Sequence, residues 1–453
     1  MPRQSRGYAR PAIASAGAVA ALSLGLACGA AGSPVSAARS AAARDHAIPS
    51  HTASPAPGAG QPPAGALSPA QLAAAYNLGP LRQRGIDGTG QTIVIVDSFG
   101  SPTISADLAS FDSAFGLRAP ASLQVIQPAG PVPAYQANST RAGWAAEATM
   151  DVEWAHAMAP AASIVLVETP TAETEGITGF PQIVTAEDYV LHHHLGQVIS
   201  ESFGATEETF SSPAQLIALR EPFELAERDH VTVLAASGDD GASGQTSDMR
   251  TVYRRPVVEW PASDPLVTAV GGTQLSLEAR GQRQAPDVGW NQGGGGRSAI
   301  FARPSYQDGV ASVTGGQRGI PDISMDASCT SPVAIYASFP GGGGWQASCG
   351  TSLATPLLAG IVALADQVAG HSLGLINPAL YKMSAAHSAG ITDILAGDNT
   401  AYLSPDGTPG DGTSGGGTSQ MVPGFRAAPG YDLATGTGTV NAAFFVPELA
   451  RGG

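Results

Sequence analysis

Residues 91–97 read Gln-Thr-Ile-Val-Ile-Val-Asp, and this run of apolar, mostly β-branched residues decides the fold. An unbroken apolar run of this length is typical of a strand that is buried on both faces, as in a parallel sheet. Similar runs follow at residues 163–168, 197–200 and 231–236, and helical patterns occur at residues 144–158, 184–195 and 213–228. This alternation predicts an α/β fold with a mainly parallel sheet and helices on both faces.

A second stretch, residues 347–356, reads Ala-Ser-Cys-Gly-Thr-Ser-Leu-Ala-Thr-Pro and leads into a helical pattern. The Gly-Thr turn places Ser352 at the predicted helix N-terminus, where unpaired N–H groups and the helix dipole favour a developing negative charge. The alternative is an N-cap serine with a proline in the first turn, which is a common helix start. Ser352 is therefore a candidate nucleophile if the chain also supplies a base.

The composition excludes several classes of partner. The chain has 453 residues, of which 43% are hydrophobic and 13% charged, and its formal net charge is −15. This negative charge argues against binding to nucleic acid or to an anionic membrane surface. A low charge density with an excess of carboxylates is compatible with work in acid, where these groups become neutral.

The N-terminus has the pattern of a secretory signal. Arg3, Arg6 and Arg10 precede an uncharged run rich in Ala and Leu, and Val-Ser-Ala at residues 35–37 offers a cleavage site. We therefore predict a signal peptide over residues 1–37 and a secreted, extracellular protein. No later stretch approaches 18 unbroken apolar residues, so stable membrane insertion is not expected.

Two further segments follow the signal. Residues 38–66 are rich in Ala, Pro, Ser and Gly, which predicts a linker or a short remnant propeptide. Residues 67–453 then form the folded domain. Cys28 allows a lipid anchor as an alternative, which Gly25 disfavours because a branched apolar residue is expected there.

If Cys28 leaves with the signal, Cys329 and Cys349 remain as a pair in an oxidising compartment. A disulfide would close a loop of about 20 residues and contribute about 3 kcal/mol in the chain-entropy model. It would also brace the backbone just before Ser352. The alternative is a pair of free buried thiols.

The histidines do not supply a conventional triad. Residues 348–356 resemble the nucleophile motif of subtilisin-like serine peptidases, Ser-Gly-Thr-Ser followed by Pro, with Cys349 inserted. In subtilisins the catalytic histidine is followed by Gly-Thr, and none of the nine histidines here has that sequence after it. The run His192-His193-His194 is predicted at a helix end, where the side chains diverge around the axis, so we interpret it as solvated. A metal site at these three residues is the alternative.

A pair of carboxyls is the better candidate for the base. Glu147 and Asp151 are four residues apart, so both lie on one face of the predicted helix, which they share with Met150, Trp154 and Met158. Two like charges on an apolar face are unfavourable, so at least one pKa rises and the pair shares a proton. The alternative, two acids on a solvated face, is disfavoured by the apolar companions.

A third carboxyl follows a predicted buried strand. Residues 235–241 read Ala-Ala-Ser-Gly-Asp-Asp-Gly, so Asp239 lies where the strand runs into a turn. The carboxyl ends of parallel strands form the edge at which such sheets bind ligands. The alternative is an ordinary turn.

These motifs together resemble the sedolisin family, the serine-carboxyl peptidases built on a subtilisin-like fold. The resemblance extends from residue 67 to the C-terminus. Its motifs are Glu147-x-x-x-Asp151 ahead of Ala159-Pro160, Ser237-Gly-Asp239, Gly350-Thr-Ser352, and Ala-Pro-Gly-Tyr-Asp at residues 428–432. Each motif alone is weak, but their order and spacing make the set specific.

The resemblance implies a role for each carboxyl. Ser352 would be the nucleophile, Glu147 its general base and acid, and Asp151 the residue that orients Glu147 and shares its proton. Asp239 would hold the oxyanion with the Ser352 backbone N–H, and only a protonated carboxyl can donate that hydrogen bond. We therefore expect an acid-active serine peptidase that forms an acyl-enzyme. Asp97 is interpreted as a structural carboxylate.

The family also implies a cofactor and a substrate class. One Ca²⁺ would bind near the C-terminus, through the side chains of Asp393 and Asp432 and the carbonyls of Ile394, Ala428 and Gly430. Peptide or protein substrates would bind in extended form along strand edges. Their predicted contacts are Ser202, Phe203, Gly204, Gly294, Gly295 and Gly296, in a protein expected to be a monomer.

One departure and one rival stand beside this prediction. Sedolisins are usually made with a folded prodomain much longer than residues 38–66. Either this domain folds without one, or the prodomain is supplied separately, or it is lost from this sequence. The rival is a secreted peptide-binding protein that keeps the fold without turnover. The four intact chemical positions disfavour that rival.

Overall fold

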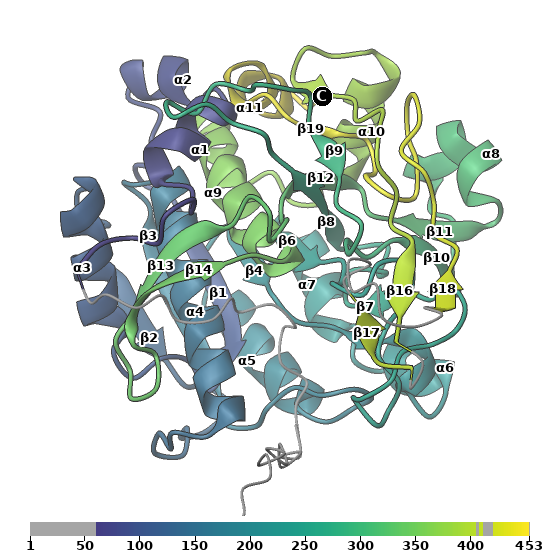
Figure 1. Ribbon diagram of the computed structural model, residues 1–453, viewed down its shortest axis with the longest axis horizontal. Helices are drawn as coiled ribbons and strands as arrows, with labels where there is room; N and C mark the ends of the chain where they lie inside the picture. The colour runs from purple at the N-terminus through teal and green to yellow at the C-terminus, as the bar shows by residue number, and fades with distance from the viewer. Residues whose placement is uncertain (1–59, 405–406, 411–419, 453) are drawn as a thin grey trace, which may run out of the picture. The chain divides into compact units, whose positions relative to one another are not determined.

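The central sheet is parallel along its whole path. The computed structural model describes residues 60–404, 407–410 and 420–452, so the predictions for residues 1–59 lie outside it. The strand order is β12 (Ile323–Asp326), β8 (Thr268–Gln274), β6 (Thr232–Ala236), β4 (Val198–Glu201), β1 (Thr92–Ser98), β3 (Ser163–Thr169) and β2 (Leu123–Ile126). Every neighbouring pair on this path runs parallel (Figure 1). The four predicted strands are β1, β3, β4 and β6, and the predicted α/β fold is confirmed.

Short strands and helices surround this sheet. The remaining strands are β5 (Ala205–Thr206), β7 (Glu259–Trp260), β9 (Val288–Gly289), β10 (Gly296–Ala302), β11 (Gln317–Ile320), β13 (Val333–Ala337), β14 (Gly344–Ser348), β15 (Ile391–Thr392), β16 (Ala401–Leu403), β17 (Pro409–Gly410), β18 (Gln420–Val422) and β19 (Thr439–Val440). The helices are α1 (Pro69–Ala75), α2 (Gly79–Gln83), α3 (Ile104–Phe115), α4 (Ser139–Met158), α5 (Phe180–His192), α6 (Pro213–Ile217), α7 (Glu221–Arg228), α8 (Ala311–Thr314), α9 (Thr351–Ala369), α10 (Asn377–Ala385) and α11 (Ala442–Leu449).

Strand β1 is buried on both faces, as its unbroken apolar run predicts. Ile93 and Ile95 belong to the core that also contains the buried residues of α4 and α9. Val94 and Val96 point the other way, into the core formed with α5 and α7. Because successive side chains of a strand alternate between its faces, apolar residues are needed at each of positions 93–96.

Helices α4 and α9 pack unusually close together. A Cβ atom on Gly360 of α9 would lie 2.4 Å from Cβ of Met158 and 3.0 Å from the Ala155 carbonyl oxygen, both on α4. Only glycine allows this approach. Helix α9 is also the one helix among the described residues that is long and apolar enough to cross a membrane, but 83% of its apolar window is buried, as in the core helix of a folded domain.

Three predicted helix boundaries need correction. The helix predicted at residues 213–228 is two helices, α6 and α7, because Pro222 lacks the N–H needed to continue a helix and its ring clashes with the preceding turn.

Helix α4 begins five residues before the predicted start, at Ser139, where the side chain of Asn138 accepts a hydrogen bond from the Arg141 N–H. Helix α5 runs over Phe180–His192 rather than residues 184–195. At its C-terminal end, His192, His193 and His194 are exposed, as predicted.

Cys329 and Cys349 form the predicted disulfide, with their Cα atoms 5.1 Å apart. The bridge joins the segment after β12 to the residue that precedes Gly350. It therefore fixes the backbone on the N-terminal side of α9.

We predict that replacing both cysteines by serine lowers the free energy of unfolding by about 3 kcal/mol, because the closed loop of about 20 residues regains its freedom in the unfolded chain. Chemical denaturation of the variant and the wild type, each measured with and without reductant, tests this. The reductant should destabilise the wild type alone. Equal stability of the two oxidised proteins would contradict the prediction.

Several carboxyls are buried away from any cation. Glu187 on α5 and Glu201 at the end of β4 lie close enough for their carboxyls to interact, and burial raises the pKa of Glu187 to about 7 and that of Glu201 well above its usual range. Burial likewise raises the pKa of Asp366 on α9 to about 7. The folded protein therefore holds protons that an unfolded chain would release above about pH 4.

We predict that the free energy of unfolding is greatest near about pH 4 and falls as the pH rises through about 7. The folded state binds more protons than the unfolded state across this window, so the slope of stability against pH is negative. Denaturation at several pH values measures the slope. Glu187→Gln should flatten it, whereas Glu224→Gln, a change at a largely exposed carboxyl on α7, should leave it as in the wild type. Stability that rises toward neutral pH would contradict this account.

Candidate active site

The predicted site residues meet at the carboxyl ends of three neighbouring strands. Asp97 lies at the end of β1, Ser202 follows β4, and Asp239 lies in the turn after β6. The N-terminus of α9 brings Ser352 to the same edge, and α4 brings Glu147 and Asp151 from the side. This is the edge at which open α/β sheets bind ligands.

Ser352 is the second residue of α9. The N-cap is Gly350, with φ of 122°, and the first helical residue is Thr351. Ser352 is therefore not an N-cap, and Pro356 lies in the second turn rather than the first. The alternative interpretation of this stretch as a serine cap followed by a first-turn proline is wrong, while the predicted placement at the helix N-terminus is confirmed.

The position of Pro356 frees the backbone carbonyl of Ser352. In a regular helix this carbonyl would accept a hydrogen bond from the N–H four residues later, and proline has none. The Ser202 hydroxyl donates to this carbonyl oxygen instead, at 3.1 Å. The main chain of Ser352 is thus tied to the loop after β4.

Glu147 and Asp151 lie buried beside Ser352. Burial is the largest cause that raises the pKa of Glu147 well above its usual range; the charges of Asp151 and Asp239 act in the same direction, and hydrogen bonding to Ser352 opposes them. Burial and then the charge of Asp97 raise the pKa of Asp151, while the nearby Ser202 hydroxyl lowers it. Oε1 of Glu147 and both carboxyl oxygens of Asp151 have no hydrogen-bond partner of good geometry among the described residues.

Asp97 is a third member of this buried group. It is fully buried, both of its carboxyl oxygens lack a hydrogen-bond partner among the described residues, and burial followed by the charge of Glu147 raises its pKa well above the usual range. The sequence placed Asp97 at a strand end but gave no reason to pair it with Asp151. Three adjacent buried carboxyls without a cation cannot all ionise, so protons are shared among them.

Asp239 is held against the start of α9. Its Oδ1 accepts a hydrogen bond of 2.8 Å from the Thr351 N–H and another of 2.8 Å from the Thr351 hydroxyl. A Cβ atom on Gly350 would lie 2.7 Å from Oδ2 of Asp239, so glycine is required there by space as well as by its positive φ. In the Gly-Thr sequence before Ser352, Gly350 thus leaves space for the Asp239 carboxyl and Thr351 donates hydrogen bonds to it.

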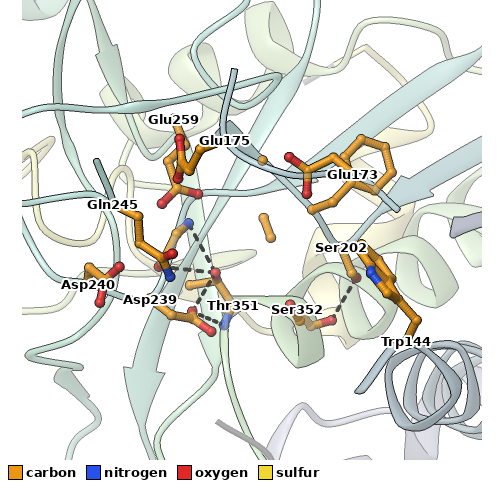
Figure 2. Close-up of a pocket in the computed structure, with 14 residues that line it drawn as sticks. Trp144, Glu173, Glu175, Ser202, Asp239, Asp240, Gln245, Glu259, Thr351 and Ser352 are labelled. Carbon is orange, nitrogen blue, oxygen red and sulfur yellow. Dashed lines mark hydrogen bonds between the residues drawn. The ribbon is translucent and has the colours of Figure 1, made fainter. Parts of the chain in front are cut away.

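A cavity opens beside Ser352 (Figure 2). Ser202, Phe203 and Gly204, predicted to contact substrate, line it. Gly294, Gly295 and Gly296 are not among its lining residues. Instead Gly294 donates from its N–H to the Gly238 carbonyl at 2.7 Å, and its carbonyl accepts from the Ser237 hydroxyl at 2.8 Å. The glycine run therefore supports the loop that carries Asp239, and its contact with substrate stays a prediction.

The cavity also contains acids that sequence reasoning missed. Glu173, Glu175, Asp240 and Glu259 line it together with Asp239. They come from the segment after β3, from the loop after β6 and from β7, and no periodicity links these segments in the sequence. The one available signal was the excess of acids over bases in the whole chain.

Four of the five predicted calcium ligands, all but Ile394, contact one another in pairs near the C-terminus. Pairing of β15 with β19 places Asp393 beside the loop at residues 428–432. The Gly430 N–H donates to Oδ2 of Asp393 at 2.8 Å, and the Ala428 N–H donates to Oδ2 of Asp432 at 2.9 Å. Among the described residues no group of three or more His, Cys, Asp or Glu side chains is placed to hold a metal, so any ion here would depend on backbone carbonyls as well.

Three curated relatives resemble this chain in sequence. Kumamolisin from Bacillus sp. (strain MN-32) is 30% identical over 83% of this chain and 62% of its own length. Sedolisin from Pseudomonas sp. (strain 101) is 30% identical over 59% of this chain and 43% of its own length. Tripeptidyl-peptidase 1 from Homo sapiens is 29% identical over 74% of this chain and 56% of its own length. The chain thus spans less than two thirds of each relative.

Structure and family comparisons agree with the sequence. The solved structure of Pseudomonas sedolisin, a serine-carboxyl proteinase complexed with two molecules of pseudo-iodotyrostatin, matches with a TM-score of 0.69 at 26% identity, over 84% of this chain and 97% of that chain. A sequence model of the subtilase family matches residues 139–415, which is more than half of the chain. The chain therefore belongs to the subtilase family, and within it to the sedolisins.

Proposed function

We propose that this chain is a secreted serine-carboxyl peptidase that hydrolyses peptide bonds in acid through an acyl-enzyme on Ser352. The observation that carries the proposal is the buried carboxyl of Glu147 beside the Ser352 side chain at the N-terminus of α9. No histidine is among the described residues that line the cavity. The carboxyl of Glu147 hydrogen-bonds the Ser352 side chain, so we take this carboxyl as the base.

In the acylation step, Oγ of Ser352 attacks the carbonyl carbon of the substrate and gives its proton to the Glu147 carboxylate. The electron pair of the C=O bond moves to the oxygen. When the tetrahedral intermediate collapses, the C–N bond breaks and Glu147 returns the proton to the leaving amine. Asp151 holds the proton that the pair shares, which leaves Glu147 able to accept one.

The oxyanion is stabilised from two sides. The Ser352 N–H lies in the first turn of α9, where helix N–H groups have no partner four residues back. Asp239 donates from a protonated carboxyl, and the two hydrogen bonds that its Oδ1 accepts from Thr351 favour the proton on Oδ2. Water then attacks the acyl-enzyme with Glu147 as base, the C–O bond to Ser352 breaks, and the serine regains its proton.

We predict that Ser352→Ala removes cleavage of a denatured protein substrate at about pH 4, by roughly 1,000-fold or more in kcat/KM. Glu147→Gln keeps the shape of the side chain but removes the base, and should reduce kcat by at least about 100-fold. Glu224→Gln is the matched control and should retain full activity. Turnover that is absent from the wild type, or equal in Ser352→Ala, would contradict the peptidase proposal and favour a peptide-binding protein.

We also predict that kcat/KM falls as the pH rises from about 4 to about 8. Burial raises the pKa values of Glu147 and Asp151, and the pair loses its shared proton as the pH rises; only a protonated Asp239 can donate to the oxyanion. A subtilisin with a histidine base shows the opposite trend and loses activity below about pH 6.5. A pH profile on one peptide, recorded after checking that the protein stays folded at each pH, distinguishes the two. An activity that rises to neutral pH would contradict the assignment.

We further propose one structural Ca²⁺ held by the side chains of Asp393 and Asp432 and the carbonyls of Ile394, Ala428 and Gly430. The donors fit a hard cation, since all are oxygens. Oδ2 of Asp432 accepts one backbone N–H, from Ala428, and shares the single proton of the Thr435 hydroxyl with Oδ1, so it retains a lone pair for a metal. The ion would fasten the loop at residues 428–432 to the loop after β15, away from the chemistry.

We predict that chelation with EGTA lowers the Tm and that Ca²⁺ restores it, because the ion binds the folded state alone. Asp393→Asn should bind Ca²⁺ more weakly, so that its Tm matches the wild type in EGTA but falls below it in Ca²⁺. Thermal unfolding under the two conditions measures this difference. Asp308→Asn, a change at an exposed carboxyl, is the control. A Tm that is insensitive to EGTA would contradict the site.

A further inference from the structure

The cavity beside Ser352 extends well beyond the groups that perform the proposed reaction. Five carboxyls line it, those of Glu173, Glu175, Asp239, Asp240 and Glu259, and no Lys, Arg or His is among its described lining residues. None of the three glutamates forms an ion pair within the described part of the chain. Figure 2 shows Glu173 on one side of the cavity and Glu175 with Glu259 on another.

Glu173 presents an unsatisfied acceptor to this cavity. The residue is only 2% exposed, and its Oε1 has no hydrogen-bond partner among the described residues. Its backbone is fixed, since its N–H donates to the Ser98 hydroxyl at 2.9 Å and a Cβ atom on Gly179 would lie 2.5 Å from its Cα. A buried oxygen left without a donor costs free energy, so its position in a cavity indicates a ligand that supplies the donor.

Two glycines make room for Glu259. A Cβ atom on Gly204 would lie 3.0 Å from Oε2 of Glu259, and one on Gly238 would lie 2.8 Å from its Oε1. These glycines belong to the loops after β4 and β6, which also carry Ser202 and Asp239. Burial is the largest cause that raises the pKa of Glu259, followed by the charges of Glu175, Asp240, Asp239 and Glu173, so all four other carboxyls face this one.

Glu175 is anchored rather than unsatisfied. Its Oε2 accepts hydrogen bonds from the Thr206 N–H at 2.9 Å and from the Thr209 hydroxyl at 3.0 Å, and burial raises its pKa to about 8. Apolar wall area comes from Trp144 and Phe203, which also line the cavity. The cavity therefore has an apolar part that suits a hydrocarbon stem and a cluster of acceptors that suits a group rich in N–H donors.

We propose that this cavity is the subsite for the side chain of the residue whose carbonyl Ser352 attacks, and that it selects arginine or lysine. The inference rests on the proposed peptidase function, because Ser352 and Asp239 line the cavity and so fix which substrate residue enters it. A guanidinium or ammonium ion satisfies the buried acceptors and offsets the repulsion among the carboxylates. A neutral amide side chain could also hydrogen-bond to the carboxyls if they are protonated, without offsetting any charge. The test must therefore distinguish selection of a cation from selection of a neutral amide.

Selection of a cation should strengthen as the pH rises within the acid range. In the empty cavity burial and mutual repulsion favour the protonated forms of Glu173, Glu175 and Glu259. A cation binds the ionised forms, so its entry releases protons to solvent. Raising the pH makes that release easier and favours the cationic side chain over a neutral one of the same shape.

The test compares two peptides that differ only in arginine or citrulline at the cleaved residue, since citrulline is a neutral isostere. We expect kcat/KM to favour arginine by at least about tenfold at about pH 5, with a smaller ratio at about pH 3. Glu259→Gln and Glu173→Gln should each bring the ratio toward one, whereas Glu224→Gln should keep the wild-type ratio. A ratio at or below one, or one unchanged in both cavity variants, overturns the proposal.

A second measurement does not depend on turnover. Calorimetry on Ser352→Ala should detect binding of n-butylguanidine at about pH 5 with at least about tenfold higher affinity than n-butylurea, and the added Glu259→Gln change should remove the difference. If the wild type cleaves no peptide at all, the proposed function fails. This measurement still shows whether the cavity prefers a cation to a neutral group of the same shape. Equal affinity for the two probes overturns the cation subsite.

Discussion

The close packing of α4 against α9 is the constraint on which the site depends. The absence of a side chain at Gly360 lets the two helices approach until Met158 and Ala155 lie against it. This approach carries Glu147 to Ser352, although the two residues belong to helices that are far apart in sequence. Their proposed chemistry therefore depends on a helix-packing distance that is set outside the site, at the C-terminal end of α4.

Burial of carboxyls without cations links the fold, the site and the cavity. Burial raises the pKa of the carboxyls in two pairs, Glu187 with Glu201 and Glu147 with Asp151. The cause is the same in both pairs, the loss of water around a charged group. Glu173 and Glu259 are shifted in the same way. The chain has few basic residues to pair with such groups, so their protonated form is favoured, and protonation is most complete in acid.

The sequence predicts the sheet well because the signal for a doubly buried strand is local. It also predicts Glu147 with Asp151, since an i, i+4 pair needs only one helix to bring it together. It fails where the cause is tertiary: Glu173 and Glu259 meet through the packing of separate segments. It also gives no sign that every residue of α4 from Gly143 onward is buried, including Glu153, which accepts a hydrogen bond from the Tyr336 N–H at 3.0 Å. An amphipathic pattern does not describe such a helix.

The hydrogen bond from Ser202 to the Ser352 carbonyl gives the proposed nucleophile a support outside α9. Pro356 removes the helix's internal bond at this point, so the main chain of Ser352 is coupled to the strand edge that also carries the cavity wall. Because this hydrogen bond joins the Ser352 main chain to a residue that lines the cavity, the proposed attacking oxygen and a side chain bound in the cavity would share one support.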